Sequence, residues 1–257
     1  MRQGVGGFLF DLDGVFYIGD ELVPGAISTL EKLISRGIPY RFITNTTTQP
    51  AAALHHKLKE LGIPAMINQL VTAPVATRNY LLSEGLTRAC LAVTPAVIED
   101  FSGIEHTEEN PQAVVIGDIG DAWSYSLLDN LFQHLLGGAR LVAMHRNKYW
   151  QTGQGLHVDI GAFVAGLEYV MSTEAVITGK PSAAFFAAAL ESLGVDSARV
   201  VVVGDDVQTD VAGAQAVGLR AAQVKTGKYR AELVADSGVT PDWTIDSIAE
   251  LEQIYNP

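Results

Sequence analysis

Short apolar runs alternate with helical patterns along most of this chain. The runs Val5–Phe10 and Tyr40–Thr44 are predicted to be strands. Between them, apolar residues in Ala26–Arg36 recur at helical spacing until Gly37, which predicts a helix. The clearest buried strand is Arg199–Val203, with four consecutive valines. Because strands that alternate with helices build βαβ units, the sequence predicts an α/β fold with a mostly parallel sheet.

The same alternation continues through the rest of the chain. It predicts further strands at Asn68–Val71, Ala89–Val93, Ala113–Ile116, Leu141–Met144 and Arg220–Val224, and further helices at Ala51–Leu61, Val75–Ser83, Ala96–Phe101, Tyr125–Leu136, Ile160–Met171, Ala183–Leu193 and Val207–Val217. Surface loops are expected at Glu105–Pro111 and at the polar, aromatic stretch His145–Leu156.

Composition and charge exclude several classes of protein. Hydrophobic residues make up 48% and charged residues 18% of the 257 residues, which is typical of a globular chain. The net charge of −12 creates no overall field that would attract nucleic acid or anionic lipid, so we expect neither as a partner. No apolar stretch approaches the about 20 residues of a membrane helix, and no signal-peptide pattern is visible. The single cysteine, Cys90, favours a reducing compartment, and the sequence therefore predicts a cytoplasmic protein.

Two carboxylates follow the first predicted strand. Asp11 and Asp13 stand two residues apart, and Gly14 after them allows a sharp turn. In open α/β sheets, ligands bind beyond the carboxyl ends of the strands, which makes this motif a candidate site. A polar strand end with turn residues, or a calcium loop, would produce a similar pattern.

A second acidic motif follows the valine strand. Asp205 and Asp206 come directly after Gly204, and Asp210 lies four residues beyond Asp206, on the same face of a predicted helix. Helix capping would explain one of these aspartates, but three within six residues behind a buried strand favour a functional site.

Smaller signals follow other predicted strands. Thr44, Asn45 and Thr46 offer hydroxyl and amide groups that suit phosphate oxygens, although an ordinary capped turn has the same composition. Lys180 lies between a glycine and a proline just before a helix, where it can balance anionic charge or be a plain surface lysine.

Convergence of these motifs at one sheet edge would have an electrostatic consequence. Like charges about 4 Å apart repel by roughly 4 kcal/mol at an effective dielectric constant of 20. A cluster of Asp11, Asp13 and Asp205 would therefore take up protons or bind a cation, and oxygen ligands favour a hard ion such as Mg²⁺. With the ion, Lys180 and Thr44 present, a phosphate dianion can enter this site despite its carboxylates.

Four motifs together resemble those of the haloacid dehalogenase superfamily of phosphohydrolases and follow the same order along the chain. They are Asp11–Gly14, Thr44, Lys180, and Gly204–Asp206 with Asp210. The local sequence resembles the class II-capped, NagD-like branch of this superfamily around Asp11, Ile43–Thr46, Gly179–Ser182 and Gly204. The stretch Val224–Arg230 is most similar to the phospholysine phosphohistidine inorganic pyrophosphate phosphatase group. The resemblance implies a Rossmann-like doubly wound parallel sheet core, residues 1–76 plus 179–257, with an inserted α/β cap domain, residues 77–178.

The resemblance also implies roles for the acidic residues. Asp11 would be the nucleophile that forms an aspartyl-phosphate, and Asp13 the general acid and base. Mg²⁺ would be bound by Asp11, the main-chain carbonyl of Asp13, and Asp205. Asp206 and Asp210 would support the water molecules of the metal or the lysine ammonium.

Phosphate contacts and partners follow from the same resemblance. Thr44, Asn45 and Lys180 would hold the phosphoryl oxygens. The substrate would be a small phosphorylated metabolite with a phosphomonoester, pyrophosphate or P–N bond. A homodimer through the cap is expected by analogy with the family.

Residues of the predicted cap are candidates for contacting the leaving group. They are the aromatic, basic loop His145–Trp150, His157 and Asp159, although Tyr149 and Trp150 are as readily packing residues. The stretch Gly117–Asp121 imitates the second acidic motif, and we interpret it as the end of a cap strand.

Two other classes of function are compatible with parts of the pattern. A signalling receiver domain also uses acidic residues, Thr and Lys with a phosphorylated aspartate, but its phospho-accepting residue lies mid-sheet in a shorter domain. A metabolite-binding protein without hydrolysis would need no intact catalytic set, whereas Asp11, Asp13, Lys180 and Asp205 are all present.

Overall fold

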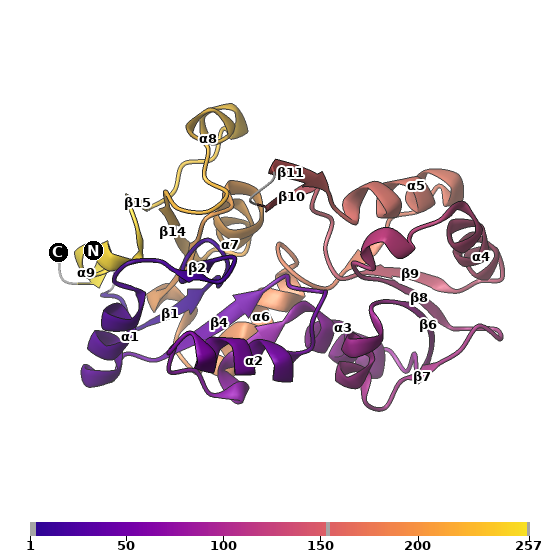
Figure 1. Ribbon diagram of the computed structural model, residues 1–257, viewed down its shortest axis with the longest axis horizontal. Helices are drawn as coiled ribbons and strands as arrows, with labels where there is room; N and C mark the ends of the chain where they lie inside the picture. Colours follow the sequence, from indigo (N-terminus) through magenta and orange to yellow (C-terminus); the bar gives the residue numbers. More distant parts are fainter. Residues whose placement is uncertain (1–3, 153–154, 256–257) are drawn as a thin grey trace. The chain divides into compact units, whose positions relative to one another are not determined.

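The computed structural model describes residues 4–152 and 155–255. The chain divides into two compact units. The core unit comprises Met1–Thr44, Leu54–Val71 and Lys180–Pro257, and the second unit comprises Asn45–Ala53 and Thr72–Gly179. In Figure 1 the core unit accordingly carries the colours of both ends of the chain, and the second unit those of its middle.

The core unit is built on a six-stranded sheet with the order β15-β14-β13-β1-β4-β5. The strands are β1 (Gly7–Phe10), β4 (Tyr40–Thr44), β5 (Leu70–Thr72), β13 (Val200–Gly204), β14 (Arg220–Val224) and β15 (Trp243–Ile245). Strand β1 pairs in parallel with β13 and with β4, and the parallel pairing continues through β14 to β15. The predicted α/β fold with a parallel sheet is thus confirmed.

The order of the strands decides where a ligand can bind. The chain passes from β1 to β4 on one side of the sheet and later returns to β13 on the other side of β1. Strand β1 therefore lies where the winding of the sheet reverses, and crevices at such points lie beyond the carboxyl ends of the strands. Asp11 is the residue that follows β1.

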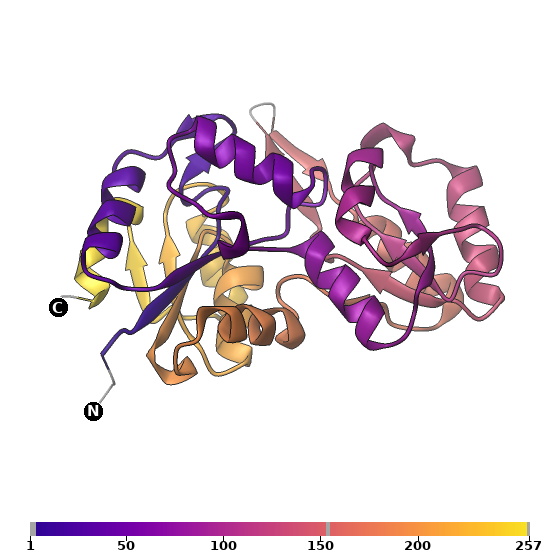
Figure 2. The ribbon, with the colours of Figure 1, turned by 90° about the horizontal axis from the view of Figure 1, so that it is seen from below.

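Buried apolar residues hold this sheet between two layers of helices. Helices α1 (Ala26–Ser35) and α2 (Ala51–Glu60) pack on the face that carries Phe8, Phe10 and Val203. Helices α6 (Ala183–Leu193) and α7 (Gly213–Ala216) cover the other face, as Figure 2 shows. Because β1 and β13 are buried on both faces, they are continuous apolar runs, as parallel strands require.

The second unit has a separate parallel sheet with the order β12-β9-β8-β6-β7. Its strands are β6 (Arg88–Ala92), β7 (Glu105–His106), β8 (Ala113–Ile116), β9 (Arg140–Ala143) and β12 (Val176–Ile177). Helix α3 (Ala73–Ser83) packs against one apolar cluster of this unit, whereas α4 (Tyr125–Leu136) and α5 (Gly161–Met171) pack against another.

Several segments differ from the sequence prediction. The helix predicted for Ala96–Phe101 is a 3₁₀-helix, Pro95–Phe101, and a 3₁₀-helix, Ile67–Gln69, replaces the first part of the strand predicted for Asn68–Val71. The predicted loop His145–Leu156 contains an antiparallel hairpin, β10 (Tyr149–Thr152) and β11 (Gly155–Val158). The predicted loop Glu105–Pro111 begins with the edge strand β7. The single helix predicted for 207–217 is a π-helix, Val207–Ala212, followed by the short α7, and this π-helix begins directly beside the acidic motif. Such π-helical turns often occur at functional sites.

Among the described residues, we find no helix with the length and apolar character that crossing a bilayer requires.

An aromatic cluster provides a test of the core unit. Phe42 of β4 is fully buried and packs edge-on against Phe16 and Tyr40, with ring centroids 5.4 Å and 5.3 Å apart. We expect Phe42→Ala to lower the free energy of unfolding by about 3–5 kcal/mol, because it leaves a cavity among these rings. Urea denaturation followed by circular dichroism measures the change. Ile34→Ala on α1 is the control, because the Ile34 side chain is half exposed and should change stability by only about 0.5 kcal/mol.

Candidate active site

The two acidic motifs meet at the carboxyl edge of the core sheet. The Asp11 N–H donates to the carbonyl of Val203 at 2.9 Å, so that the ladder between β1 and β13 extends one residue beyond β1. This register brings Asp11 next to the Gly204–Asp205 end of β13. Carboxylate oxygens of Asp11, Asp205 and Asp210 lie within 4.8 Å of one another, and all three side chains are buried.

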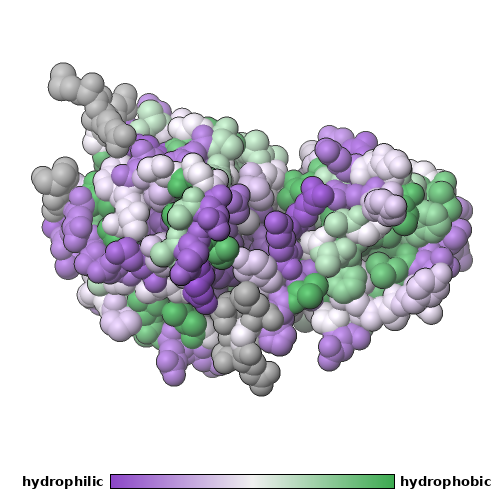
Figure 3. Space-filling model, turned by 90° about the horizontal axis from the view of Figure 1, so that it is seen from above, coloured by the Kyte–Doolittle hydropathy of each residue, from purple (hydrophilic) through white to green (hydrophobic). Residues whose placement is uncertain are grey.

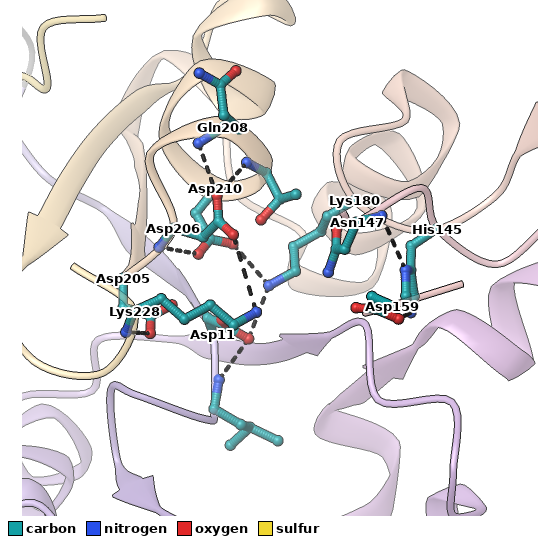
Figure 4. Close-up of polar contacts among 12 residues, drawn as sticks. Asp11, His145, Asn147, Asp159, Lys180, Asp205, Asp206, Gln208, Asp210 and Lys228 are labelled. Atoms are coloured by element: carbon teal, nitrogen blue, oxygen red, sulfur yellow. Dashed lines mark hydrogen bonds and ion pairs between the residues drawn. The ribbon is translucent and has the colours of Figure 1, made fainter. Parts of the chain in front are cut away.

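Lys180 lies among these carboxylates. Its ammonium is 2.8 Å from Asp11 Oδ1 and 2.7 Å from Asp210 Oδ1, and only 2% of the side chain is exposed (Figure 4). Burial disfavours the charged form of Lys180, but the two carboxylates favour it more strongly, and the pKa of Lys180 therefore lies above its usual value. The interpretation of Lys180 as a plain surface lysine is wrong, because a buried lysine of this kind balances anionic charge.

Asp210 is fixed from two sides. One carboxylate oxygen accepts from Lys180, and the other accepts the main-chain N–H of Asp206 at 3.1 Å. A side chain at Gly204 would place its Cβ only 2.2 Å from the Asp210 carboxyl carbon. The glycine at the end of β13 is therefore what allows Asp210 to approach the strand.

Asp205 has an unsatisfied oxygen. Its Oδ2 accepts the main-chain N–H of Lys228 at 2.6 Å, whereas Oδ1 is buried and has no hydrogen-bond partner among the described residues. Burial and the charges of Asp11 and Asp210 raise the pKa of Asp205 well above its usual value. A buried carboxylate oxygen without a donor fits a bound cation or proton, and this donor set suits a hard cation.

Asp13 occupies a different environment from Asp11. Its side chain reaches the solvent, yet loss of hydration and the nearby charge of Asp11 raise the pKa of Asp13. Gly14 follows with a φ of +82°, and its N–H donates to the carbonyl of Tyr17 at 2.7 Å, which turns the chain away from the sheet. A carboxyl that keeps its proton to higher pH is suited to donate it.

The remaining predicted residues are distributed between the units. Thr44 ends β4 and is buried in the core unit, whereas Asn45 begins the second unit. Asp206 accepts the main-chain N–H groups of Gln208 and Thr209 at 2.9 Å and 3.1 Å and thereby caps the π-helix. The alternative interpretation of the second motif, helix capping, therefore holds for Asp206.

In the second unit, two of the predicted leaving-group residues lie together. His145 and Asp159 are buried, with His145 Nε2 3.9 Å from Asp159 Oδ1, and the N–H of Asn147 donates to His145 Nδ1 at 3.3 Å (Figure 4). Trp150 and His157 face each other across the hairpin, with ring centroids 5.5 Å apart. Contact of these residues with a substrate stays a prediction.

The stretch that imitates the second motif forms a turn after β8. Asp118 Oδ1 accepts the N–H of Gly120 at 2.8 Å. This geometry agrees with its interpretation as the end of a strand.

Sequence reasoning missed the loop after β14. Thr226 donates its hydroxyl proton to the carbonyl of Gly14, and Lys228 holds Asp205 through its main chain. The signal was available, because Thr226–Lys228 follows the predicted strand Arg220–Val224 and therefore belongs to the same edge of the sheet. From the sequence alone, this stretch carries the family resemblance but no role in the site.

The crowded carboxylates predict how stability depends on pH. Between its usual pKa of about 4 and its raised folded-state value, Asp205 binds more protons in the native than in the unfolded state, so stability falls as pH rises. We expect the metal-free protein to melt at a higher temperature at pH 5.5 than at pH 7.5 in differential scanning fluorimetry, and Asp205→Asn to reduce this difference. Each kcal/mol corresponds to about 2–4 °C in a chain of this size.

The control for this experiment is Asp20→Asn, because 94% of the Asp20 side chain is exposed. It should retain the wild-type pH dependence. An identical pH dependence of the melting temperature in Asp205→Asn and wild type would contradict the assignment of this dependence to Asp205.

Comparisons with known proteins agree with this geometry. A family model described as haloacid dehalogenase-like hydrolase matches residues 8–103, and a second, HAD-hydrolase-like, matches residues 177–251. Haloacid dehalogenase-like hydrolase domain-containing protein 2 of Bos taurus is 39% identical over 90% of this chain and 88% of its own length. Phospholysine phosphohistidine inorganic pyrophosphate phosphatase of Homo sapiens is 35% identical over 96% of this chain and 93% of its own length.

Solved structures show the same similarity. The 4-nitrophenylphosphatase of Thermotoga maritima superimposes with a TM-score of 0.91, at 28% identity, over 98% of both chains. NagD of E. coli K-12 superimposes with a TM-score of 0.86, at 25% identity, over 96% of this chain and 98% of NagD. The resemblance inferred from the motifs is confirmed: the chain belongs to the haloacid dehalogenase-like hydrolases, and it is a phosphatase of their NagD-like branch.

Proposed function

We propose that this phosphatase is a Mg²⁺-dependent phosphohydrolase that cleaves a small phosphorylated metabolite through an aspartyl-phosphate on Asp11. The observation that carries the proposal is the fixed orientation of the Asp11 carboxylate. The Leu12 N–H and the Lys180 ammonium both contact Oδ1 of Asp11, each at 2.8 Å. A carboxylate held in this way at the switch point of a parallel sheet is placed to act as a nucleophile.

The two half-reactions use two different aspartates. An oxygen of Asp11 attacks phosphorus while the bond to the leaving group breaks, and Asp13 gives its proton to the leaving atom. A water molecule then attacks the phosphorus of the aspartyl-phosphate and gives a proton to Asp13, and inorganic phosphate leaves as the bond to Asp11 breaks. The raised pKa of Asp13 supports the first proton transfer, because Asp13 must hold a proton when the substrate arrives.

Positive charge is needed for a phosphate dianion to approach Asp11. Lys180 supplies one charge beside the nucleophile, and Asp11, Asp205 and the main-chain carbonyl of Asp13 would hold Mg²⁺. When bound, the ion would neutralise charge on the phosphoryl oxygens. Asp210 belongs to the same carboxylate cluster, but its contact with Lys180 assigns it to the support of the lysine. Thr44 and Asn45 are proposed to hold phosphoryl oxygens.

We also propose that residues 77–178, which form most of the second unit, act as the cap of this phosphatase, and that residues 1–76 plus 179–257 form its core. The support is that the second unit has a sheet and apolar clusters of its own. His145–Trp150, His157 and Asp159 are then the candidates that select the leaving group. Names of the relatives suggest phospholysine, phosphohistidine, pyrophosphate and 4-nitrophenyl phosphate as compounds to test first.

The nucleophile is tested by Asp11→Asn. We expect wild type to release phosphate from at least one of these compounds only when Mg²⁺ is present, and the variant to be slower by at least about 10³-fold, because an amide is a poor nucleophile. Phosphate release is measured with and without EDTA, and Asp20→Asn serves as the matched control, because the Asp20 side chain is exposed. Lasting phosphorylation of Asp11 without turnover would instead favour a signalling protein, and no hydrolysis by wild type would favour a binding protein.

The acid and base is tested by Asp13→Asn. We expect this variant to slow both the formation and the hydrolysis of the phosphoenzyme, by about 10²–10⁴-fold, because proton transfer is lost in both steps. Rapid-quench kinetics with p-nitrophenyl phosphate measures the two steps separately. Unchanged turnover would contradict this role for Asp13.

We propose a homodimer that forms through the second unit, in the cytoplasm. Apolar side chains reach the surface of this unit in Figure 3, and Leu136, Tyr169 and Val170 are each more than half exposed. Sedimentation equilibrium at micromolar concentration should give a mass of twice 27.5 kDa. A monomer under these conditions would contradict the proposal.

A further inference from the structure

The loop Thr226–Lys228 links the two acidic motifs of the core unit. The Thr226 hydroxyl donates to the carbonyl of Gly14, and the Lys228 N–H donates to Asp205 Oδ2 at 2.6 Å. A Cβ on Gly227 would lie 2.1 Å from Asp205 Oδ2 and 2.5 Å from the Cα of Gly14. The main chain of this loop therefore approaches both motifs so closely that only glycine fits between them.

The side chain of Lys228 continues from this anchor into the carboxylate cluster. Its ammonium is 4.0 Å from Asp206 Oδ2, which is beyond hydrogen-bonding distance, and 30% of the side chain is exposed. Figure 4 shows Lys228 extending across the site, with its nitrogen above Asp11. The charge of Lys228 acts on five carboxylates, those of Asp205, Asp206, Asp11, Asp210 and Asp13.

The two lysines of the site differ in what they can still bind. Lys180 is buried and makes short ion pairs with Asp11 and Asp210, so its charge is balanced inside the protein. Lys228 makes only the long contact with Asp206 among the described ion pairs and is partly open to solvent. An arriving phosphate needs a cation that can turn toward it, and a lysine ammonium with three rotatable donors is suited to this.

We propose that Lys228 contacts the substrate: its ammonium binds oxygens of the transferred phosphoryl group, while its main-chain N–H positions Asp205. This inference rests on the proposed function, because it assigns a second lysine to the same phosphate site. The two parts of Lys228 have separate effects. The side chain contributes charge to the bound anion, and the main chain contributes geometry to the carboxylate cluster.

Removal of the ammonium is tested by Lys228→Met, with inorganic phosphate and Mg²⁺ as probes in isothermal titration calorimetry. With Mg²⁺ present, we expect phosphate to bind to this variant about 10-fold more weakly than to wild type, because one charge-assisted contact is lost. Mg²⁺ alone should bind as well as in wild type or more tightly, since a positive charge beside the carboxylates has been removed. Lys228→Arg should restore most of the phosphate affinity.

Lys225→Met is the matched control. Lys225 lies three residues earlier, is 45% exposed in its side chain and pairs with Asp246 at 2.7 Å, away from the acidic motifs. The Lys225→Met variant should bind phosphate and Mg²⁺ as wild type does. Wild-type phosphate affinity in Lys228→Met would overturn the proposal, and so would an equal loss of Mg²⁺ and phosphate binding, which would indicate a merely structural role.

The main-chain role is tested by Gly227→Ala. The added methyl group would displace Asp205, and we expect this variant to bind Mg²⁺ and phosphate at least about 10-fold more weakly. Gly238→Ala is the control for backbone strain, because Gly238 has a φ of +68° against +62° for Gly227 but nothing within 4 Å of an added Cβ. Equal Mg²⁺ affinity in the two glycine variants would overturn this part of the proposal.

Kinetics separate this inference from the proposed function. If wild type hydrolyses p-nitrophenyl phosphate, Lys228→Met should raise KM about 10-fold, and an unchanged KM would overturn the inference while the proposed function stands. If wild type hydrolyses none of the compounds tested, the proposed function fails, and the calorimetric comparison still decides whether Lys228 binds phosphate.

Discussion

Repulsion among buried carboxylates is the constraint on which the rest of this site depends. Asp11 follows β1, whereas Asp205 and Asp210 both follow β13, and the parallel register of the two strands brings the three carboxylates within 4.8 Å of one another. Such a cluster persists only when positive charge or protons offset it. Lys180 offsets part of the charge inside the protein. The Asp205 oxygen for which the described residues provide no hydrogen-bond partner marks where more positive charge fits. The need for cations is thus built into the fold, and under the proposed function the same cations would admit a phosphate.

Close packing of the main chain makes this arrangement possible. Side chains at Gly14, Gly204 and Gly227 would each come within 2.2 Å of an aspartate carboxylate of the cluster. Gly14 follows β1, Gly204 ends β13, and Gly227 follows β14. The three glycines therefore lie where three neighbouring strands end and the loops of the site begin. Carboxylates and main-chain donors can approach one another there because no Cβ lies between them. The positions of the acidic groups depend on these glycines as much as on the strands.

The site also separates tasks among chemically similar residues. Asp11 is held through one oxygen, Asp13 reaches the solvent, and Asp206 caps the π-helix, so three aspartates of similar sequence context have three environments. The lysines divide in the same way, with Lys180 buried between carboxylates and Lys228 partly exposed. Environment, rather than residue type, therefore distinguishes the proposed nucleophile, the proposed proton carrier and a structural cap.

Much of the fold and site was predictable from the sequence alone. The alternation of apolar runs with helical patterns determined the parallel sheet, and the strand ends at Asp11, Thr44 and Asp205 determined which side chains share its edge, because both follow from local periodicity. Only the tertiary structure decided that Lys180 is buried between Asp11 and Asp210 and that Lys228 holds Asp205 through its main chain. Such contacts join residues that are far apart along the chain, or use main-chain donors that every residue except proline carries. No pattern of side chains encodes them, and they are fixed only when the strands are packed in register.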